Sequence, residues 1–426
     1  MTGGGASSPD VMSPPASSSH PRDGAGPQPP AGPQPPAGPV VSAGPEPPAG
    51  PVPLPAPTLR HLRALSGPFG LFEHARGAEP RPECGYCTDD NGRALALACR
   101  VPADPYAEEL AHQSLRFLER AYLGGGRFRL RLSASGRWRT EPPSDDAAGR
   151  ALLGLGVAAV AAPWEAVRER AGRLFVEAAG FRSSWPRAAA YAALGAAEVA
   201  LAPHADGRYR EAARRLLAGA AEVLPLPAGS PSEERWGRLD DGRLDDGQAP
   251  RKRNWRWPEA RLTYANALLP AGLLAAGEAL GRDDLVVGGL DLLDWLVDEE
   301  ALEGRFSFAP VGGRGPDGPK PAWDQQPIEA TAMANACAWA LRLSGEKRWH
   351  TSLKAALWWW LGRNDGAALV WDPATGGGHD GLHPDGVNAN QGAESTIALV
   401  GAMVLAQAQP LSASSRLETE ALAAPT

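Results

Sequence analysis

Hydrophobic residues recur with a helical period from residue 58 onward, and the helical segments are of two kinds. In the first kind, apolar residues recur along one side of the helix and the positions between them are charged. Val167, Ala171 and Leu174, for example, recur among Glu and Arg residues. This pattern is typical of a helix with one solvent-exposed face. The segments that share it are 106–122, 164–178, 209–224, 283–299 and 346–361.

The second kind of segment is rich in small residues and carries at most two charged residues. A helix that is apolar on every side belongs in a protein interior. Four such segments stand out, at 147–161, 186–202, 326–343 and 391–408. The two kinds alternate along the chain, so we expect each inner helix to be followed by an outer helix.

Counting both kinds gives six helical hairpins. The inner helices are expected to begin near Asn91, Asp146, Pro186, Pro258, Gln326 and Gln391. Five outer helices follow the first five, and a short helix at 59–65 is expected to complete the sixth hairpin. Solenoid repeats keep a constant period, whereas these starts are 55, 40, 72, 68 and 65 residues apart. The sequence therefore predicts an all-α fold, and a closed (α/α)6 toroid rather than an open solenoid.

Composition separates a tail from the folded part of the chain. Residues 1–57 contain 18 of the 43 prolines and no Phe, Trp or Tyr. They cannot bury enough apolar surface to offset the entropy lost on ordering. We predict a disordered Pro/Gly/Ala-rich tail at 1–57, the toroid at 58–410 and a flexible C-terminus at 411–426.

Charge and composition argue against several classes of protein. A net charge of −7 without a basic stripe is unlike a nucleic-acid binder. The longest apolar run, 151–164, is shorter than the ~20 residues of a membrane-spanning helix, and the N-terminus lacks the apolar region of a secretory signal. The four cysteines complete no zinc pattern. We expect a cytoplasmic protein with reduced thiols that needs no metal or cofactor and binds neither nucleic acid nor membrane.

Polar and aromatic residues gather where each inner helix is expected to begin. Since the inner helices of a toroid run parallel, their N-termini meet at one mouth of the ring. The segments are 86–91, 144–146, 183–186, 255–259, 323–329 and 388–395. Helix capping accounts for Ser, Asp, Asn and Pro at such positions, but not for the tryptophans and amides. Aromatic faces beside amides and carboxylates suit a sugar, so we predict a carbohydrate site at this mouth.

A glycine-rich loop at 376–388 leads into the last inner helix. Its glycines let the backbone approach a ligand closely. His379 and His383, with Asp380 or Asp385, would suit either a sugar or a metal, and the lack of metal-binding spacing favours the sugar. A duplicated Gly-Arg-Leu-Asp-Asp at 237–247 lacks the spacing of a calcium-binding EF-hand loop, and we interpret it as a solvated insertion.

Three motifs resemble a bacterial family of six-hairpin glycosidase-like proteins. They are YCTDDNGRAL at 86–95, WDQQPIEA at 323–330 and DGLHPDGVNANQGAEST at 380–396. Members are often labelled "glycosyltransferase", and some are joined to or encoded beside true glycosyltransferases. The resemblance covers about residues 70–405. It implies an (α/α)6 fold and carbohydrate metabolism, with a glycosyltransferase encoded nearby as an implied partner.

The predicted activity is cleavage of a glycosidic bond in a short oligosaccharide, by water or by phosphate. This chemistry needs a carboxylic acid with a raised pKa and a second carboxylate as base. We predict Glu329 as the acid and Asp90 or Asp324 as the base, with Glu259, Asp385 and Glu394 in reserve. The residues expected to bind the substrate are Tyr86, Asp89, Asn91, Arg93, Trp255, Trp257, Tyr264, Trp323, Gln325, Gln326, His379, Asp380, His383, Asn388, Asn390 and Gln391.

Two alternative functions remain open. One is a sugar epimerase on the same toroid that uses His379 and His383 as its acid/base pair. The other is a non-catalytic carbohydrate-binding partner of a glycosyltransferase. A nucleotide-sugar glycosyltransferase itself is disfavoured, because such enzymes bind the nucleotide at the strand ends of α/β sheets and the sequence shows no alternation of strands and helices.

Overall fold

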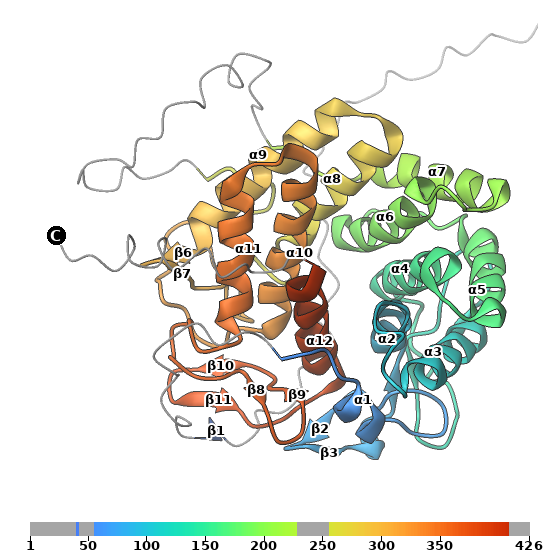
Figure 1. The fold of residues 1–426 in the computed structure, drawn as a ribbon, viewed down its shortest axis with the longest axis horizontal. Coiled ribbons are helices and arrows are strands. Elements are labelled where there is room, and N and C mark those ends of the chain that lie inside the picture. The colour runs from blue at the N-terminus through green and yellow to red at the C-terminus, as the bar shows by residue number, and fades with distance from the viewer. Residues whose placement is uncertain (1–39, 42–54, 228–254, 409–426) are drawn as a thin grey trace, which may run out of the picture. The chain divides into compact units, whose positions relative to one another are not determined.

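The computed structural model describes residues 40–41, 55–227 and 255–408, within a compact unit that begins at Ala37. This part of the chain is helical, with short strand pairs in the connections (Figure 1). The expected all-α class is therefore confirmed. Most of the predicted tail, the duplicated segment at 237–247 and the predicted C-terminal segment lie outside the described residues. No helix in the described ranges is long and apolar enough to cross a membrane.

Within these ranges, six inner helices form a closed ring (Figure 1). They are α2 (Thr88–Arg100), α4 (Asp145–Ala161), α6 (Pro186–Leu201), α8 (Leu268–Leu280), α10 (Pro327–Ser344) and α12 (Ala393–Ala408). Each packs against the next in chain order, and α12 packs against α2. That last contact closes the ring, so the predicted (α/α)6 toroid is confirmed and the open solenoid is excluded.

The outer helices cover the ring, each one packing against the inner helix that precedes it. They are α3 (Ala107–Ala121), α5 (Glu165–Ala178), α7 (Gly207–Ala221), α9 (Asp283–Glu300) and α11 (Lys347–Trp359). The short α1 (Arg60–Ala64) packs against α12 and completes the sixth hairpin, as expected. Large side chains of the outer helices, such as Phe117, Phe175 and Trp349, are fully buried. The core therefore lies between the two rings.

Glycines let the first three inner helices pack closely. A Cβ atom added to Gly154 of α4 would lie 2.2 Å from the carbonyl oxygen of Gly92 on α2. One added to Gly156 would lie 2.2 Å from the carbonyl oxygen of Gly195 on α6. The small residues that mark the inner segments in the sequence thus set the distance between neighbouring helix backbones.

Short antiparallel strands shape the loops between the helices. The strand pairs are β2 (Ala75–Arg76) with β3 (Glu79–Pro80), β4 (Tyr86–Cys87) with β5 (Arg131–Leu132), β6 (Ala301–Leu302) with β7 (Arg305–Phe306), and β8 (Trp371–Asp372) with β9 (Gly377–Gly378). A three-stranded sheet has the order β1 (Val40–Val41), β11 (Gly386–Asn388) and β10 (Leu382–His383). β4 runs directly into α2, and β11 precedes α12, so two of these sheets hold the chain where inner helices begin.

The fourth inner helix begins later than predicted. α8 starts at Leu268, not near Pro258, and the preceding residues from 255 onward form a loop. Side-chain contacts hold this loop: the ring of Trp257 stacks on Trp295 with centroids 6.0 Å apart, and Glu259 pairs with Arg187. These contacts join residues that are distant in the sequence. The Pro-Glu pair at 258–259 is typical of a helix start, but here the distant contacts hold it in a loop, so the predicted start was wrong.

Candidate active site at the mouth of the toroid

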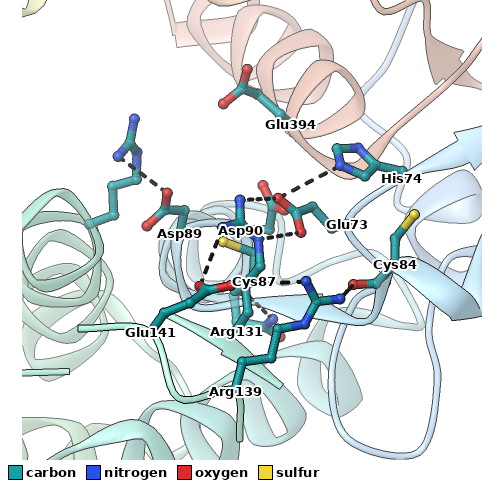
Figure 2. A network of polar contacts seen from close by, with 12 residues as sticks. Glu73, His74, Cys84, Cys87, Asp89, Asp90, Arg131, Arg139, Glu141 and Glu394 are labelled. Carbon is teal, nitrogen blue, oxygen red and sulfur yellow. Dashed lines mark hydrogen bonds and ion pairs between the residues drawn. The ribbon is translucent and has the colours of Figure 1, made fainter. Parts of the chain in front are cut away.

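The N-terminal ends of the inner helices bring carboxylates and arginines together at one mouth of the ring. α2 contributes Asp89, Asp90 and Arg93, and α4 contributes Asp146 and Arg150. Figure 2 shows Asp89 and Asp90 next to each other, with Glu394 of α12 extending toward the same space. The positive end of each helix dipole favours negative charge here.

Arg93 joins the first and last inner helices. Its Nη2 lies 2.6 Å from Oδ1 of Asp90, and its Nη1 lies 2.7 Å from Oε2 of Glu394. Burial raises the pKa of Asp90 to about 7, and Arg93 offsets only part of that effect. Burial also opposes ionisation of Glu394, but the positive charges of Arg93 and Arg150 outweigh it and lower the pKa of Glu394.

Arg150 holds two carboxylates from neighbouring helices. Its Nη1 lies 3.5 Å from Oδ2 of Asp89 and 3.4 Å from Oδ2 of Asp146. Because both carboxylate oxygens contact the same nitrogen, at 3.5 and 3.4 Å, they are at most about 7 Å apart. The guanidinium lies over the ring of Tyr191 on α6, 4.5 Å from its centroid. Both carboxylate side chains are partly exposed, at 22% and 23%, so a ligand at the mouth can reach them.

The two carboxylates have different surroundings. Burial raises the pKa of Asp89, the charge of Asp146 adds to that shift, and Arg150 partly opposes it. Oδ1 of Asp89 is buried and has no hydrogen-bond partner among the described residues, which disfavours the charged form. Asp146 instead accepts a hydrogen bond from the hydroxyl of Tyr264 as well as the contact with Arg150. The raised pKa of Asp89 is the property expected of a proton donor.

The loop that carries Tyr264 is held by Glu329. The carboxylate of Glu329 accepts hydrogen bonds from the backbone N–H groups of Ala265 and Asn266, and from the side-chain amide of Asn266. Glu329 is only 2% exposed, and burial raises its pKa. Its oxygens are engaged by the protein itself, so Glu329, predicted as the general acid, lies behind the mouth and not at its surface.

Arg187 of α6 anchors the segment before α8. Its guanidinium donates two hydrogen bonds to Glu259, at 2.6 and 2.8 Å, and a third to the carbonyl oxygen of Tyr264. Trp257 donates through Nε1 to the same Glu259 carboxylate, and Trp255 donates to its backbone carbonyl. Of the predicted residues in this segment, Glu259 therefore forms an ion pair, while the tryptophans pack beside it.

A second ion-pair network holds the loop that carries His74. Arg131 on β5 donates two hydrogen bonds, each 3.0 Å long, to the carboxylate of Glu73. Figure 2 shows His74 next to Glu73, with a dashed line joining the two side chains. The imidazole of His74 lies 3.8 Å from Glu73. His74 was not among the sequence-predicted residues.

The glycine-rich loop before α12 places its side chains in different environments. His383 is largely buried, with Nε2 3.5 Å from Oδ1 of the half-exposed Asp324. Asp380 accepts hydrogen bonds from Ser395 and from the backbone of Gly392, so it caps the start of α12. Burial lowers the pKa of His379. Asp385 is exposed in the turn between β10 and β11.

Several predicted substrate-binding residues hold the backbone together and do not face the mouth. Tyr86 is fully buried and stacks on Phe72. The amide side chains in this group are buried and bonded to backbone or to neighbouring side chains: Asn91, Gln325, Asn388, Asn390 and Gln391. Gln326 and Trp323 are partly exposed at the start of α10. Within the described ranges, no three His, Cys, Asp or Glu side chains are arranged to hold a metal ion.

Besides His74, the sequence-based selection omits Arg150, Arg187 and Tyr191, which the structure places in the site. Asp146 is included in the predicted segment at 144–146 but was not chosen as a catalytic or binding residue. A usable signal was present, because Arg150 and Arg187 are isolated charges in helices that are otherwise apolar. An arginine in an interior helix needs a buried partner or a polar site. Here both find carboxylates at the mouth.

Solved structures share this fold. No family model and no curated protein matches the sequence. A sugar epimerase from a ruminal bacterium superposes with a TM-score of 0.56 at 10% identity, over 81% of this chain and 94% of that one. The cellobiose 2-epimerase of Spirochaeta thermophila gives 0.57 at 13% identity, over 82% and 94%. A D-mannose isomerase gives 0.54 at 11% identity, over 82% and 94%. The chain thus has the six-hairpin toroid fold of these proteins.

Proposed function

We propose that this protein is a carbohydrate-processing enzyme that cleaves a glycosidic bond of a short oligosaccharide at the mouth of the toroid. The observation that carries the proposal is the pair Asp89 and Asp146, contributed by neighbouring inner helices and held on one nitrogen of Arg150. Asp89 protonates the leaving oxygen, and Asp146 acts as base or nucleophile. The sequence-based choice of Asp90 and Glu329 is replaced by this pair, since both of those carboxyls are buried.

The electrostatics of the pair support this division of roles. Glycoside cleavage needs one carboxyl that keeps its proton and one that is ionised. The pKa of Asp89 is raised by burial, while Asp146 accepts from the Tyr264 hydroxyl and lies against a cation. The raised pKa of Asp89 suits the acid, which leaves Asp146 for the role of base or nucleophile.

The separation of the two carboxyls is compatible with glycosidase chemistry. Their nearest contacts to Arg150 limit the Oδ2–Oδ2 distance to about 7 Å. Carboxyls about 5–5.5 Å apart allow direct attack on the sugar, and about 6.5–9.5 Å leaves room for an attacking water. The anomeric configuration of the first product distinguishes direct attack by the carboxylate, which retains it, from attack by water, which inverts it.

A sugar substrate is supported by the aromatic side chains near the carboxylates and by the fold. Partly exposed Trp323, Trp255 and Tyr264 accompany the carboxylates in the loops before the inner helices. The structures that share the fold are described as sugar epimerases and a mannose isomerase. An oligosaccharide is the proposed substrate, and a glycosyltransferase encoded nearby stays a sequence-based expectation.

Product analysis tests the proposal. The purified full chain is incubated with gluco- and manno-oligosaccharides, with and without phosphate. We expect cleavage by the wild type and a loss of about 10²–10⁴-fold in Asp89→Asn and Asp146→Asn. Asp145→Asn is the matched control, since Asp145 is the neighbouring carboxylate and, among the described residues, accepts its hydrogen bond from Ser183. Cleavage that survives Asp146→Asn would contradict the proposal.

One observation favours sugar epimerisation as a second candidate. His383 pairs with the half-exposed Asp324, and an imidazole beside a carboxylate is a side-chain pair that can move a proton at a sugar carbon. Reaction in D2O separates the candidates, because an epimerase incorporates deuterium at the carbon it inverts and a glycosidase does not. Deuterium incorporation that is lost in His383→Asn and retained in Asp146→Asn would replace the glycosidase proposal.

A further inference from the structure

An apolar cavity of ≈ 190 Å³ lies inside the ring of inner helices, below the mouth. It starts at Arg93 and Glu394, the ion pair that joins α2 to α12, and Tyr191 also lines it. Tyr191 is the ring on which Arg150 rests. The cavity therefore begins directly beneath the residues that hold Asp89 and Asp146.

The walls of the cavity are mostly apolar. Leu97 of α2, Leu194 of α6 and Ile397 of α12 line it with other small and aliphatic side chains, and α10 adds Thr331, Asn335 and Trp339. At its far end are Arg100 and Glu198, which pair with each other. Charged groups thus stand at both ends of an apolar interior.

The cavity follows the helices for most of their length. On α12 its lining runs from Glu394 to Leu405, a distance of about 16 Å at 1.5 Å per residue. A volume of ≈ 190 Å³ is too small to hold a peptide helix, about 10–12 Å wide, over this length. It fits a single extended hydrocarbon chain, and dry cavities lined by aliphatic side chains bind apolar molecules.

We infer that the natural substrate is an amphiphilic glycoside whose sugar lies at the mouth and whose alkyl chain enters the axial cavity between α2, α6, α10 and α12. The inference rests on the proposed function for the sugar end. The continuity of the cavity with the mouth, through Arg93, Glu394 and Tyr191, selects an amphiphile over a free hydrocarbon. The charged residues at the mouth bind the sugar, and the apolar walls of the cavity accept only the alkyl chain.

Binding affinity tests the inference without requiring turnover. Titration calorimetry on the full chain compares n-octyl β-D-glucoside and n-octyl β-D-maltoside with their methyl counterparts, below the micelle concentration. We expect the octyl glycosides to bind at least tenfold more tightly, since each buried methylene contributes about a fourfold gain. We also expect 1-octanol to bind at least tenfold more weakly than the octyl glycosides. Equal affinities for octyl and methyl glycosides, or for octanol and octyl glycosides, would overturn the inference.

Filling the cavity provides the matched control. Gly401 lines it, and a Cβ there would meet a methyl of Thr331 at an ordinary contact distance of 3.5 Å, so Gly401→Leu is chosen to place the rest of the Leu side chain in the cavity. Ala332→Leu, on the facing helix α10, is the second filling variant. Gly207→Leu makes the same change at an exposed helix start. The chain-length preference should vanish in the filling variants and persist in Gly207→Leu. A preference that survives both folded filling variants would overturn the inference.

The experiments can overturn the inference about the alkyl chain and the proposed cleavage mechanism independently of each other. If octyl chains add no affinity while Asp146→Asn still abolishes sugar cleavage, only the inference about the alkyl chain is overturned. If octyl chains add affinity that Gly401→Leu removes, while Asp146→Asn cleaves like the wild type, only the carboxylate mechanism is overturned.

Discussion

The carboxylate of Glu329 accepts a hydrogen bond from the backbone N–H of Ala265, a residue in the left-handed conformation with φ of 44°. This conformation costs a non-glycine residue about 1–2 kcal/mol. Tyr264 precedes Ala265 directly and donates its hydroxyl to Asp146. A carboxylate on α10 therefore controls, through one loop, the surroundings of a carboxylate on α4.

We predict that Glu329→Gln loosens this loop without removing a catalytic group. A Gln amide N–H would face one of the backbone N–H donors, so at least one hydrogen bond is lost, at a cost of about 1–3 kcal/mol of stability. The rate of sugar cleavage should fall about tenfold, as expected for the weakening of one hydrogen bond to Asp146. Thermal unfolding and kcat measure the two effects.

Ala265→Gly in the Glu329→Gln background is the control, because glycine adopts positive φ without strain. It should restore part of the lost stability. A Glu329→Gln variant with unchanged stability and with activity as low as that of Asp146→Asn would show that Glu329 itself is the catalytic acid.

The sequence located this region but not the roles within it. Helical periodicity and the scarcity of charge in the inner segments predicted the ring, and the polar and aromatic residues at the expected helix starts pointed to one mouth of it. Glu329 stands at the predicted start of α10, yet the loop around Ala265 covers it, and the burial of a side chain by a distant loop leaves no local signal. For the same reason Pro258 and Glu259 resembled a helix start, although the partner that holds them, Arg187, is 72 residues away from Glu259.

Asp90 makes stability depend on pH. Burial raises its pKa to about 7 in the folded protein, from a usual value of 3.8, so the folded state binds the proton more tightly than the unfolded chain. The contribution of Asp90 to stability therefore falls as pH rises from about 4 to about 7, by at most about 1.4 kcal/mol per pH unit. It is constant above that window.

Urea unfolding of wild type and Asp90→Asn across this range isolates the effect. The free energy of unfolding of the variant relative to wild type should rise with pH between about 4 and 7. Arg93 keeps Glu394 as partner in the variant. Two parallel pH curves would mean that Asp90 has an ordinary pKa in the folded state.

Glycines at the close contacts between inner helices contribute to the stability of the ring. In Gly154→Ala the new methyl would meet the backbone of Gly92 at 2.2 Å, so we expect a loss of about 1–3 kcal/mol from overpacking. In Gly401→Ala the nearest atom is 3.5 Å away, so we expect a gain of about 0.5–1 kcal/mol from higher helix propensity. Chemical denaturation of both variants tests the pair. Equal effects at the two positions would mean that α2 and α4 are not in close backbone contact.

The central claim is that Asp89 and Asp146 perform different parts of one glycosidic cleavage. The most direct measurement compares kcat/KM of Asp89→Asn and Asp146→Asn on an oligosaccharide and on the dinitrophenyl glycoside of the same sugar, whose leaving group needs no proton. We expect Asp89→Asn to lose about 10²–10⁴-fold on the oligosaccharide and to remain near wild-type activity on the dinitrophenyl glycoside, while Asp146→Asn loses activity on both. Equal losses of Asp89→Asn on the two substrates, or full activity of either variant on the oligosaccharide, would contradict the assignment.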